Sequence, residues 1–345
     1  MITRTKSSID LQNQLAKRIQ KHFPIVERPF LHLANEFSLT EKEILQQLEE
    51  WNHQKYLREI SAVMEGEVLN YDSALVCGRI LEKDLDNVVS ILKEHPTITH
   101  LYLRKYEINL WFTIAVSKDT GIEKHLKALS NLTGYKYYPL RRTQTFKIGV
   151  NFDLNKKINI TEKTYIPSNF NKFPQEELTE EVKQIIRAIQ TPLPFIERPF
   201  DKLAKEFSLT EKKLLSFLNS SPYGCIRKYV ATFNHRKLGV SYNAMTVWKV
   251  PEKELELKGN QLANFPEVSH CYARTTLPEF PYNLYSMIHG PNEETVHNII
   301  KNISNKLGIT EYLILYSPIE YKKTRLKYFL KELEEWEFTN IILEY

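Results

Sequence analysis

The sequence predicts an α+β protein built as a tandem duplication, in which each half joins a helix-turn-helix domain to a βαββαβ sheet domain. The first observation is an internal repeat. The segment PIVERPFLHLANEFSLTEK at 24–42 recurs as PFIERPFDKLAKEFSLTEK at 194–212, with 14 of 19 positions identical at an offset of 170. The second observation is that both repeats are followed by the same change, from helical periodicity to the alternating periodicity of strands.

The same offset continues beyond this block. It pairs Ala74 with Ala244, Pro96 with Pro266, His100 with His270, Tyr102 with Tyr272 and Arg104 with Arg274; after a slip of four residues Asn109 matches Asn283. Each half is therefore a complete set of domains. Because joining two similar subunits raises their effective concentration, we expect the halves to pair within the chain. The sequence leaves open whether the fused chain forms a further homodimer.

We expect three helices at the start of each half. They cover about 11–22, 29–36 and 40–50 in the first copy, and 176–190, 199–206 and 210–218 in the second. The hydroxyls of Thr40 and Thr210 precede the third helices as N-caps, and Pro29 and Pro199 suit the first turn of the second helices. The second and third helices of each set have helix-turn-helix spacing.

Six elements follow in the order strand, helix, strand, strand, helix, strand, which is that of a ferredoxin-like sheet with helices on one face. They cover about 71–80, 82–94, 97–105, 108–116, 119–132 and 135–150, and then 241–250, 251–264, 268–275, 282–290, 293–307 and 310–316. A further helical period runs over 324–336. The predicted domains are helix-turn-helix at 9–66 and 176–238, ferredoxin-like at 67–150 and 239–345, and a linker rich in Asn, Lys and Pro at 151–175.

Composition and charge narrow the function classes. Hydrophobic residues make up 42% and charged residues 26% of the 345, as in ordinary globular proteins, and no apolar run approaches the roughly 20 residues that span a bilayer. The N-terminus lacks the apolar core of a signal peptide, and the three cysteines follow no metal-ligand spacing, which together predict a cytoplasmic protein without a metal site of its own. The net charge of +5 permits an anionic partner without requiring nucleic acid.

The order of domains resembles the Lrp/AsnC family of transcription regulators. In a DNA-binding protein of this kind, the third helix approaches phosphates and base edges with basic or amide side chains. Here the third helix of the first copy reads TEKEILQQLEEW, with four glutamates and one lysine, and that of the second offers only Lys212 and Lys213 as cations. These helices argue against DNA binding, so the fold alone does not identify a regulator.

One segment of the second copy carries a more specific resemblance. From Tyr242 it reads YNAMTVWKVPEKELELKGNQLANFPEVSHCYARTTLPEFPYNLYSMIHG. This is similar to the signature of siroheme decarboxylases and their relatives in heme d1 formation: an Asn-Ala-Met-x-Val-Trp strand, then Phe-Pro-x-Val-Ser-His-Cys-Tyr-x-Arg, then Pro-Tyr-Asn-Leu-Tyr-x-Met-x-His-Gly. The preceding IRKYVATFNHRKLGVSYNAM resembles the family's basic approach to the same strand, with Lys228 where the family has a second arginine.

This resemblance implies a lyase that converts siroheme to 12,18-didecarboxysiroheme by removing two acetate carboxyl groups, in heme or heme d1 biosynthesis. The partner is then the tetrapyrrole itself. No added cofactor is required, because the substrate brings its own iron and its own electron sink. The alternative is a regulator of the Lrp/AsnC type, or a heme-sensing protein that binds heme without catalysis.

The residues of this segment suit such a substrate. Strand alternation places His270, Tyr272 and Arg274 on one face, and it places Tyr282 and His289 on opposite faces of the next strand. The carboxylates of siroheme call for guanidinium, ammonium and hydroxyl groups, and its iron accepts an imidazole. Loss of carbon dioxide leaves carbanion character that an acid must protonate, and histidine titrates near neutral pH.

We therefore predict that His270 and His289 share the roles of proton donor and ligand of the substrate or its iron, in an order that the residues leave open. Tyr282 is the third catalytic candidate. The candidate substrate-binding residues are Arg227, Lys228, His235, Tyr272, Arg274, Asn283 and Trp248. Structural interpretations compete for some of them: Trp248 as a core residue, Arg274 paired with Glu279, and His235 in a solvated basic segment.

The first copy departs from this pattern. It keeps His100, Tyr102 and Arg104 but lacks the proline-containing loop, and Ala115 stands where the second copy has His289. The missing histidine favours a first copy that supports the fold and completes the pocket. The sequence leaves open whether it also has a reaction site of its own.

Overall fold

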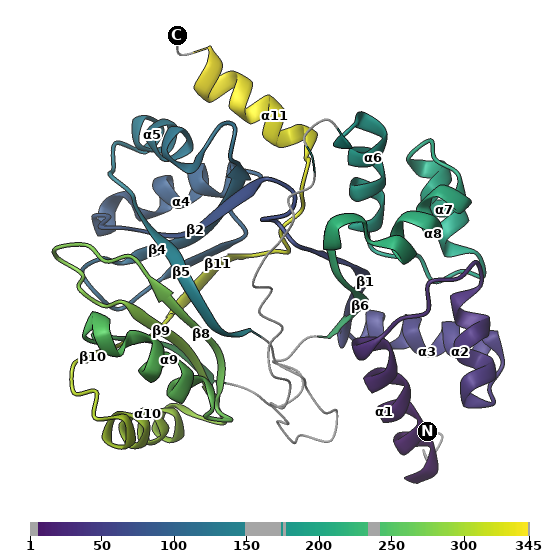
Figure 1. Cartoon of the computed structure of the whole chain (residues 1–345), viewed down its shortest axis with the longest axis horizontal. Coiled ribbons are helices and arrows are strands. Elements are labelled where there is room, and N and C mark those ends of the chain that lie inside the picture. The colour runs from purple at the N-terminus through teal and green to yellow at the C-terminus, as the bar shows by residue number, and fades with distance from the viewer. Residues whose placement is uncertain (1–5, 149–173, 175–176, 234–241, 344–345) are drawn as a thin grey trace. The chain divides into compact units, whose positions relative to one another are not determined.

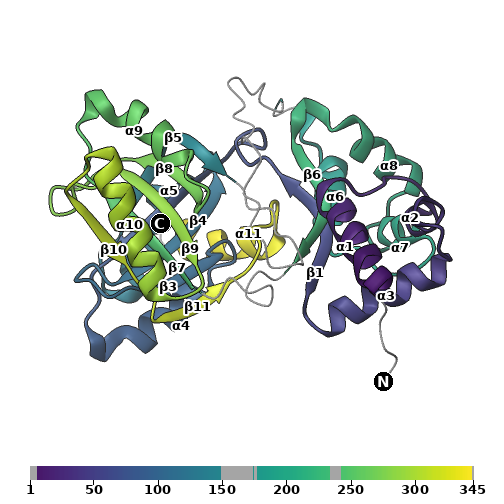
Figure 2. The ribbon, with the colours of Figure 1, turned by 90° about the horizontal axis from the view of Figure 1, so that it is seen from below.

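The computed structural model describes residues 6–148, 174, 177–233 and 242–343, which form two compact units. Figure 1 and Figure 2 show the elements of each. One unit takes 6–70, 174 and 177–233 and contains the helical domains of both copies, whereas the other takes 71–148 and 242–343 and contains both sheet domains. The two copies therefore pair within the chain in each unit. The predicted linker at 151–175 lies, apart from 174, outside the described residues.

The helix-turn-helix unit contains the six predicted helices. They are α1 (Lys6–Lys21), α2 (Pro29–Phe37), α3 (Glu41–His53), α6 (Glu180–Ile189), α7 (Pro199–Glu206) and α8 (Glu211–Ser220). The predicted caps are confirmed: Thr40 accepts a hydrogen bond from the Glu43 amide in a capping box, and Thr210 accepts one from the Lys213 amide. Pro29 and Pro199 occupy the first turns of α2 and α7.

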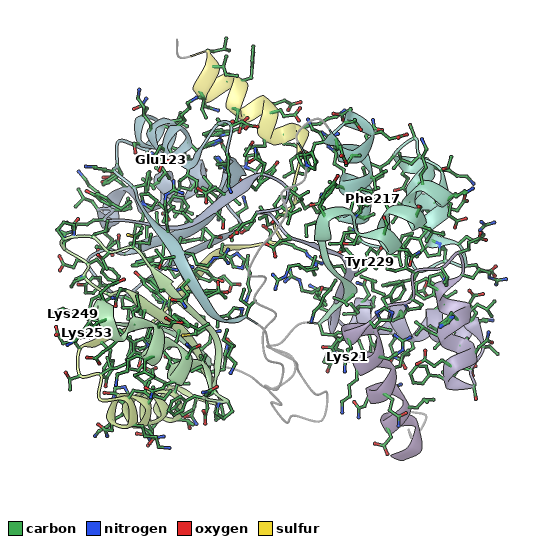
Figure 3. The ribbon with its side chains drawn as sticks, in the orientation of Figure 1. Lys21, Glu123, Phe217, Tyr229, Lys249 and Lys253 are labelled. Carbon is green, nitrogen blue, oxygen red and sulfur yellow. The ribbon has the colours of Figure 1, made fainter. Side chains whose placement is uncertain are left out.

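Two strands that the sequence analysis did not predict join the copies in this unit. β1 (Leu57–Met64) pairs antiparallel with β6 (Ile226–Phe233). The short 3-10 turn Pro222–Gly224 precedes β6. On β6, Tyr229, which is labelled in Figure 3, packs against the rings of Phe23 and Phe200, one from each copy, at centroid distances of 6.0 and 5.7 Å. The two-stranded sheet of β1 and β6 is thus part of a core that both helix-turn-helix domains share.

The glutamates of the third helices take part in this pairing. Arg28 contacts both Glu41, at the start of α3, and Glu197 of the other copy at 3.2 Å. Arg198 does the same in reverse, with Glu211 and with Glu27 at 3.3 Å. One glutamate of each third helix, Glu41 or Glu211, therefore binds the arginine that contacts the other copy.

The sheet unit holds one nine-stranded sheet. Its strands are β2 (Tyr71–Gly78), β3 (His100–Leu103), β4 (Leu110–Ser117), β5 (Tyr138–Ile148), β7 (Tyr242–Trp248), β8 (Val268–Arg274), β9 (Leu284–Gly290), β10 (Tyr312–Leu315) and β11 (Ile319–Lys323), in the order β10-β7-β9-β8-β5-β2-β4-β3-β11. Because β10 and β11 follow one another in the chain and stand at opposite ends of this order, the sheet closes on itself. The backbone contact from the Lys105 amide to the Tyr316 carbonyl, at 3.2 Å, lies at this closure.

Helices cover only the outer face of the sheet, as predicted. In the first copy these are α4 (Leu85–Glu94), after the 3-10 turn Glu82–Asp84, and α5 (Ile122–Thr133); in the second they are α9 (Leu255–Ala263), after Glu252–Glu254, and α10 (Glu293–Leu307). Each copy has its own helix-side core. The inner faces meet in a third group, here called the inner cluster: Cys77, Ile108, Trp111, Leu140, Met245, Val247, Phe280, Tyr285 and Leu315.

Strand β5 ties the copies together. It pairs with β2 of its own copy and with β8 of the other. Near its end Phe146 enters the helix-side core of the second copy, where it is only 7% exposed. Gly259 on α9 makes room for it, because a Cβ atom there would lie 2.3 Å from the Phe146 ring.

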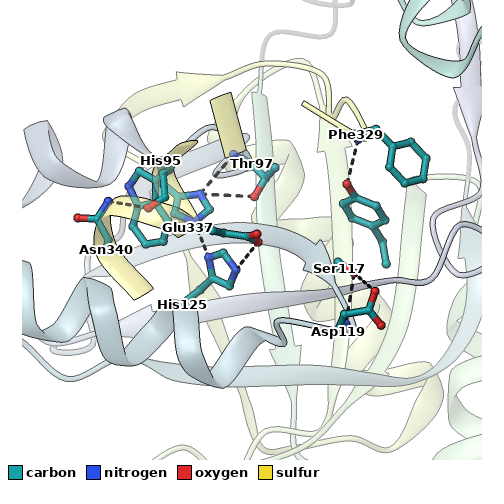
Figure 4. A network of polar contacts seen from close by, with 10 residues as sticks. His95, Thr97, Ser117, Asp119, His125, Phe329, Glu337 and Asn340 are labelled. Carbon is teal, nitrogen blue, oxygen red and sulfur yellow. Dashed lines mark hydrogen bonds and ion pairs between the residues drawn. The ribbon is translucent and has the colours of Figure 1, made fainter. Parts of the chain in front are cut away.

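The C-terminal segment differs from the prediction of one helical period over 324–336. The C-terminal segment begins with β11, which ends at Lys323 and pairs with β3 of the first copy. The helix α11 (Lys331–Glu337) starts later than predicted and continues as a π-helix over Phe338–Ile342. Figure 4 shows what holds α11: buried His95 and His125 contact each other at 3.0 Å, and Glu337 reaches His125 at 3.0 Å. The Trp336 ring stacks on His125 with an interplanar angle of 10°.

Candidate active site

The predicted row on β8 has the expected alternation. His270, Tyr272 and Arg274 are half-buried on the inner face, whereas Cys271 and Ala273 between them are fully buried in the helix-side core. On β9 the same inner face carries Tyr285 and Met287, which lie opposite Tyr272 and His270 in the register.

The two histidines meet through a residue that the sequence analysis did not single out. The Ser269 hydroxyl oxygen lies 2.9 Å from Nδ1 of His270 and 2.6 Å from Nε2 of His289, and it is fully buried. A residue that precedes His270 on a regular strand would point to the opposite face. The register shift between Val268 and His270 is a bulge, and it allows Ser269 to reach both imidazoles.

The environment of His289 keeps this imidazole neutral. Burial is the main cause, and the nearby ammonium of Lys323 adds to it; together they lower the pKa of His289 from 6.5 to about 4. Lys323 ends β11, opposite His100 of the first copy. At neutral pH His289 therefore carries one ring proton, on either Nδ1 or Nε2, and its hydrogen-bond partners decide which of the two nitrogens carries it.

Arg274 is a half-buried cation whose Nε atom is fully buried. Its Nη1 donates to the Leu140 carbonyl of the first copy at 3.0 Å, its guanidinium lies 5.3 Å from the Tyr272 ring, and its buried Nε has no hydrogen-bond partner among the described residues. Burial lowers the pKa of Arg274. The alternative pairing with Glu279 is not among the ion pairs of the described residues.

A second arginine of the first copy was missed. Arg142 lies opposite Arg274 in the β5–β8 register and adds to the positive charge there, which itself lowers the pKa of Arg274. The signal was present in the sequence as an Arg-Arg pair inside the predicted strand at 135–150. The partner strand could not be read from the sequence, because it belongs to the other copy.

Tyr282 lies on the inner side, which corrects the predicted face. It packs against the inner cluster, with its ring 4.9 Å from that of Phe280. The alternation failed because β9 begins only at Leu284. Reciprocal backbone hydrogen bonds between Leu277 and Phe280 close the preceding loop. Phe280 is fully buried, and its ring centroid lies 5.4 Å from that of Trp111 in the first copy.

Two predicted substrate contacts have structural roles instead. The Asn283 side chain bonds both backbone groups of Val250, accepting from its amide at 3.0 Å and donating to its carbonyl at 2.8 Å, so its amide is already satisfied. Trp248 is fully buried in the helix-side core, where its Nε1 donates to Ser286 at 2.9 Å. The core interpretation of Trp248 is thus the right one, because its side of the sheet faces the helices.

The remaining basic candidates belong to the other unit or lie outside the described residues. Arg227 and Lys228 are exposed on β6 of the helix-turn-helix unit, where Arg227 Nε lies 3.6 Å from Glu65 Oε2. His235 is outside the described residues. The structure thus brings His270, His289, Tyr272, Arg274 and Tyr282 onto one inner face.

The first copy has a reduced version of the same arrangement. The Thr99 hydroxyl lies 3.0 Å from Nδ1 of His100 and 2.9 Å from the Thr113 hydroxyl, so a threonine bonds the histidine as Ser269 does. Arg104 donates to the Leu315 carbonyl of the second copy at 2.9 Å, which mirrors Arg274 and Leu140. Burial lowers the pKa of Arg104 to about 10. Ala115 occupies the position of the second histidine.

The depressed pKa of His289 gives a pH dependence with a definite sign. Between about pH 6.5 and about pH 4 the unfolded chain binds a proton at this residue that the folded chain excludes, so stability falls as the pH is lowered through this window. Burial also lowers the pKa of His95, which acts in the same direction. We expect His289→Gln to lose less of its thermal stability on acidification than the wild type.

Thermal unfolding of both proteins at several pH values measures this difference. Exposed His297 on α10 provides the control, because His297→Gln should keep the wild-type pH dependence. An identical acid-induced loss of stability in wild type and His289→Gln would show that the folded protein does not exclude the proton.

Two features are absent from the described residues. None of their helices is long and apolar enough to cross a membrane. Nor do they contain a group of three or more His, Cys, Asp or Glu side chains placed to hold a metal ion.

Comparison with known families matches both kinds of domain. The model of the AsnC-like ligand-binding domain matches residues 69–147 and 237–322, one stretch in each copy. The model of the siroheme decarboxylase NirDL-like helix-turn-helix domain matches 12–58 and 182–221. The predicted fold class, two copies of a helix-turn-helix followed by an AsnC-type ferredoxin-like domain, is confirmed.

Known proteins resemble the chain over nearly its whole length. A siroheme decarboxylase of Hydrogenobacter thermophilus is 36% identical over 332 residues, which covers 94% of this chain and 96% of that protein. The siroheme decarboxylase beta subunit of Methanosarcina barkeri is 37% identical over 42% of this chain and 95% of its own length, so it corresponds to one half. The crystal structure of the siroheme decarboxylase NirDL superposes with a TM-score of 0.77 at 33% identity, covering 97% of this chain and all of that one. A crystal structure of NirDL in complex with an iron-uroporphyrin III analogue gives the same TM-score at 31% identity. The chain therefore belongs to the siroheme decarboxylase family.

Proposed function

We propose that this protein decarboxylates siroheme to 12,18-didecarboxysiroheme, removing two acetate carboxyl groups in heme or heme d1 biosynthesis. It acts as a cytoplasmic carboxy-lyase. The substrate is the tetrapyrrole with its own iron, and no added cofactor takes part. The observation that carries the proposal is the pair of histidines joined through one buried hydroxyl, on the same sheet face as the half-buried Arg274, in a chain of this family.

The Arg274 guanidinium, whose Nε is buried, binds a substrate carboxylate. Its Nε has no partner among the described residues, and a buried donor without an acceptor costs on the order of 1–3 kcal/mol. A substrate carboxylate would satisfy it through a charge-assisted hydrogen bond. Arg142, across the register, and Tyr272, stacked on Arg274, support the same carboxylate. Arg227, Lys228 and His235 remain candidate substrate-binding residues.

The histidines supply the proton that replaces the lost carboxyl group. Loss of carbon dioxide leaves an electron pair on the methylene carbon, which conjugation with the macrocycle delocalises and a proton must finally neutralise. A neutral imidazole such as His289 can donate its N–H to this carbon if its second nitrogen is supplied with a proton in turn. His270 is the other member of the pair, and the two histidines share proton donation and ligation of the substrate or its iron. Tyr282 orients the substrate from the loop side.

The first copy completes the site without a second histidine pair. Its Arg104 and Tyr102 repeat the carboxylate-binding arrangement, whereas Ala115 leaves no counterpart to His289. We assign the protonation of both acetate arms to the second copy.

Anaerobic incubation with siroheme, followed by mass measurement of the extracted pigment, tests the function. We expect the loss of two carbon dioxide units. A pigment that binds and is recovered unchanged would identify a tetrapyrrole-binding protein without catalysis instead.

A further inference from the structure

Ser269 lies between the two histidines of the candidate site. It is fully buried, and three acceptors or donors surround its oxygen: His270 Nδ1 at 2.9 Å, His289 Nε2 at 2.6 Å and the Met287 carbonyl at 3.3 Å. A serine hydroxyl has one proton to donate and lone pairs to accept with. It can therefore donate to only one of these three groups.

Because Ser269 has only one proton to donate, it limits which ring nitrogens of the two imidazoles can be unprotonated. If both nitrogens that face Ser269 carried lone pairs, the single hydroxyl proton could bond only one of them. For Ser269 to hydrogen-bond both imidazoles at these distances, one of His270 Nδ1 and His289 Nε2 must carry a proton and donate to the serine oxygen. The hydrogen bond at one nitrogen of an imidazole decides which form the other nitrogen takes, so Ser269 also controls the two nitrogens that face away from it.

The first copy supplies an internal comparison. Thr99 stands at the equivalent position, bonds His100 Nδ1 at 3.0 Å, and has Thr113 as its second partner at 2.9 Å. A hydroxyl on a β-branched side chain therefore bonds the neighbouring histidine at the equivalent position of the first copy. Only in the second copy does the hydroxyl join two imidazoles.

We infer that Ser269 is a positioning residue that fixes the tautomers of His270 and His289 in a coordinated way, so that one imidazole presents a proton and the other a lone pair to the substrate. This inference rests on the proposed function for its catalytic consequence. Its structural content, the locked tautomers, does not depend on that function.

Kinetics of three variants test the catalytic consequence. We expect Ser269→Ala to lower kcat by about 10–100-fold, the usual size for loss of a group that orients a histidine, with KM changed by less than about 3-fold. The pH profile of kcat should shift as well, because the imidazoles titrate differently without the hydroxyl. Ser269→Thr should restore most of the rate, as the Thr99 geometry indicates.

Ser286→Ala is the matched control. It removes a buried hydroxyl from the neighbouring strand, one that bonds Trp248 on the helix side, and should leave the pH profile of kcat unchanged. If Ser269→Ala has the wild-type kcat and pH profile, or if Ser269→Thr is as impaired as Ser269→Ala, the positioning role is wrong.

Nitrogen-15 NMR of histidine-labelled protein tests the tautomers without any substrate. His270→Gln and His289→Gln assign the two sets of ring signals. At neutral pH we expect each ring in one tautomer, with a proton on at least one of the nitrogens facing Ser269, and a mixture of tautomers in at least one ring of Ser269→Ala. Unchanged spectra in that variant would overturn the inference. Failure of the wild type to decarboxylate siroheme would overturn the proposed function and leave this test intact.

Discussion

His289→Ala and His270→Ala are each expected to lower the rate of siroheme decarboxylation by about 10²–10⁴-fold, the usual contribution of a positioned general acid. Each variant removes one end of the pair joined by Ser269, and the first copy has Ala115 at the position equivalent to His289. Initial rates under anaerobic conditions, with substrate binding followed by the absorbance of the tetrapyrrole, separate loss of chemistry from loss of binding.

His297→Ala provides the control for this pair. His297 lies exposed on α10 of the same copy, so its removal should leave the rate unchanged. If both site variants decarboxylated siroheme at the wild-type rate, the assignment of the proton donor to this pair would be wrong.

Phe146→Ala should produce the largest loss of stability, about 3–5 kcal/mol of the free energy of unfolding of the sheet unit. The ring comes from the first copy but fills the helix-side core of the second, so its removal leaves a cavity where β5 and α9 meet. Gly259→Ala attacks the same contact from the other side, because the new Cβ would lie 2.3 Å from the ring.

Guanidinium denaturation followed by tryptophan fluorescence measures these losses. Phe338→Ala is the matched control: its ring is 54% exposed, and we expect a change within about 0.5 kcal/mol. A Phe146→Ala protein as stable as the control would show that the first copy does not contribute to the core of the second.

Local signals were enough to predict most elements of the fold. The helix α10 covers the predicted 293–307, Thr40 and Thr210 cap the predicted helices, and the row on β8 alternates as expected. These features depend on neighbours within one turn or one strand. Three elements whose partner lies in the other copy were missed, namely β1, β6 and β11, because no hairpin turn in the sequence marks their pairing.

The site was predictable only in part, for the same physical reason. His270, His289 and Arg274 were recognised from the motif, but Ser269 was overlooked because regular alternation places it on the outer face, and only the bulge turns it inward. Asn283 and Trp248 were assigned to the substrate because their motif surrounds the site. Their side chains instead satisfy Val250 and fill the core.

Decarboxylation in deuterium oxide tests the central claim most directly, because it follows both the carboxyl group that leaves and the proton that replaces it. The account predicts a pigment that has lost two carbon dioxide units and carries one deuterium in each new methyl group, since imidazole protons exchange with solvent before they are transferred. An unchanged pigment, or a product whose new methyl groups contain no deuterium, would contradict proton delivery by the histidine pair of the second copy.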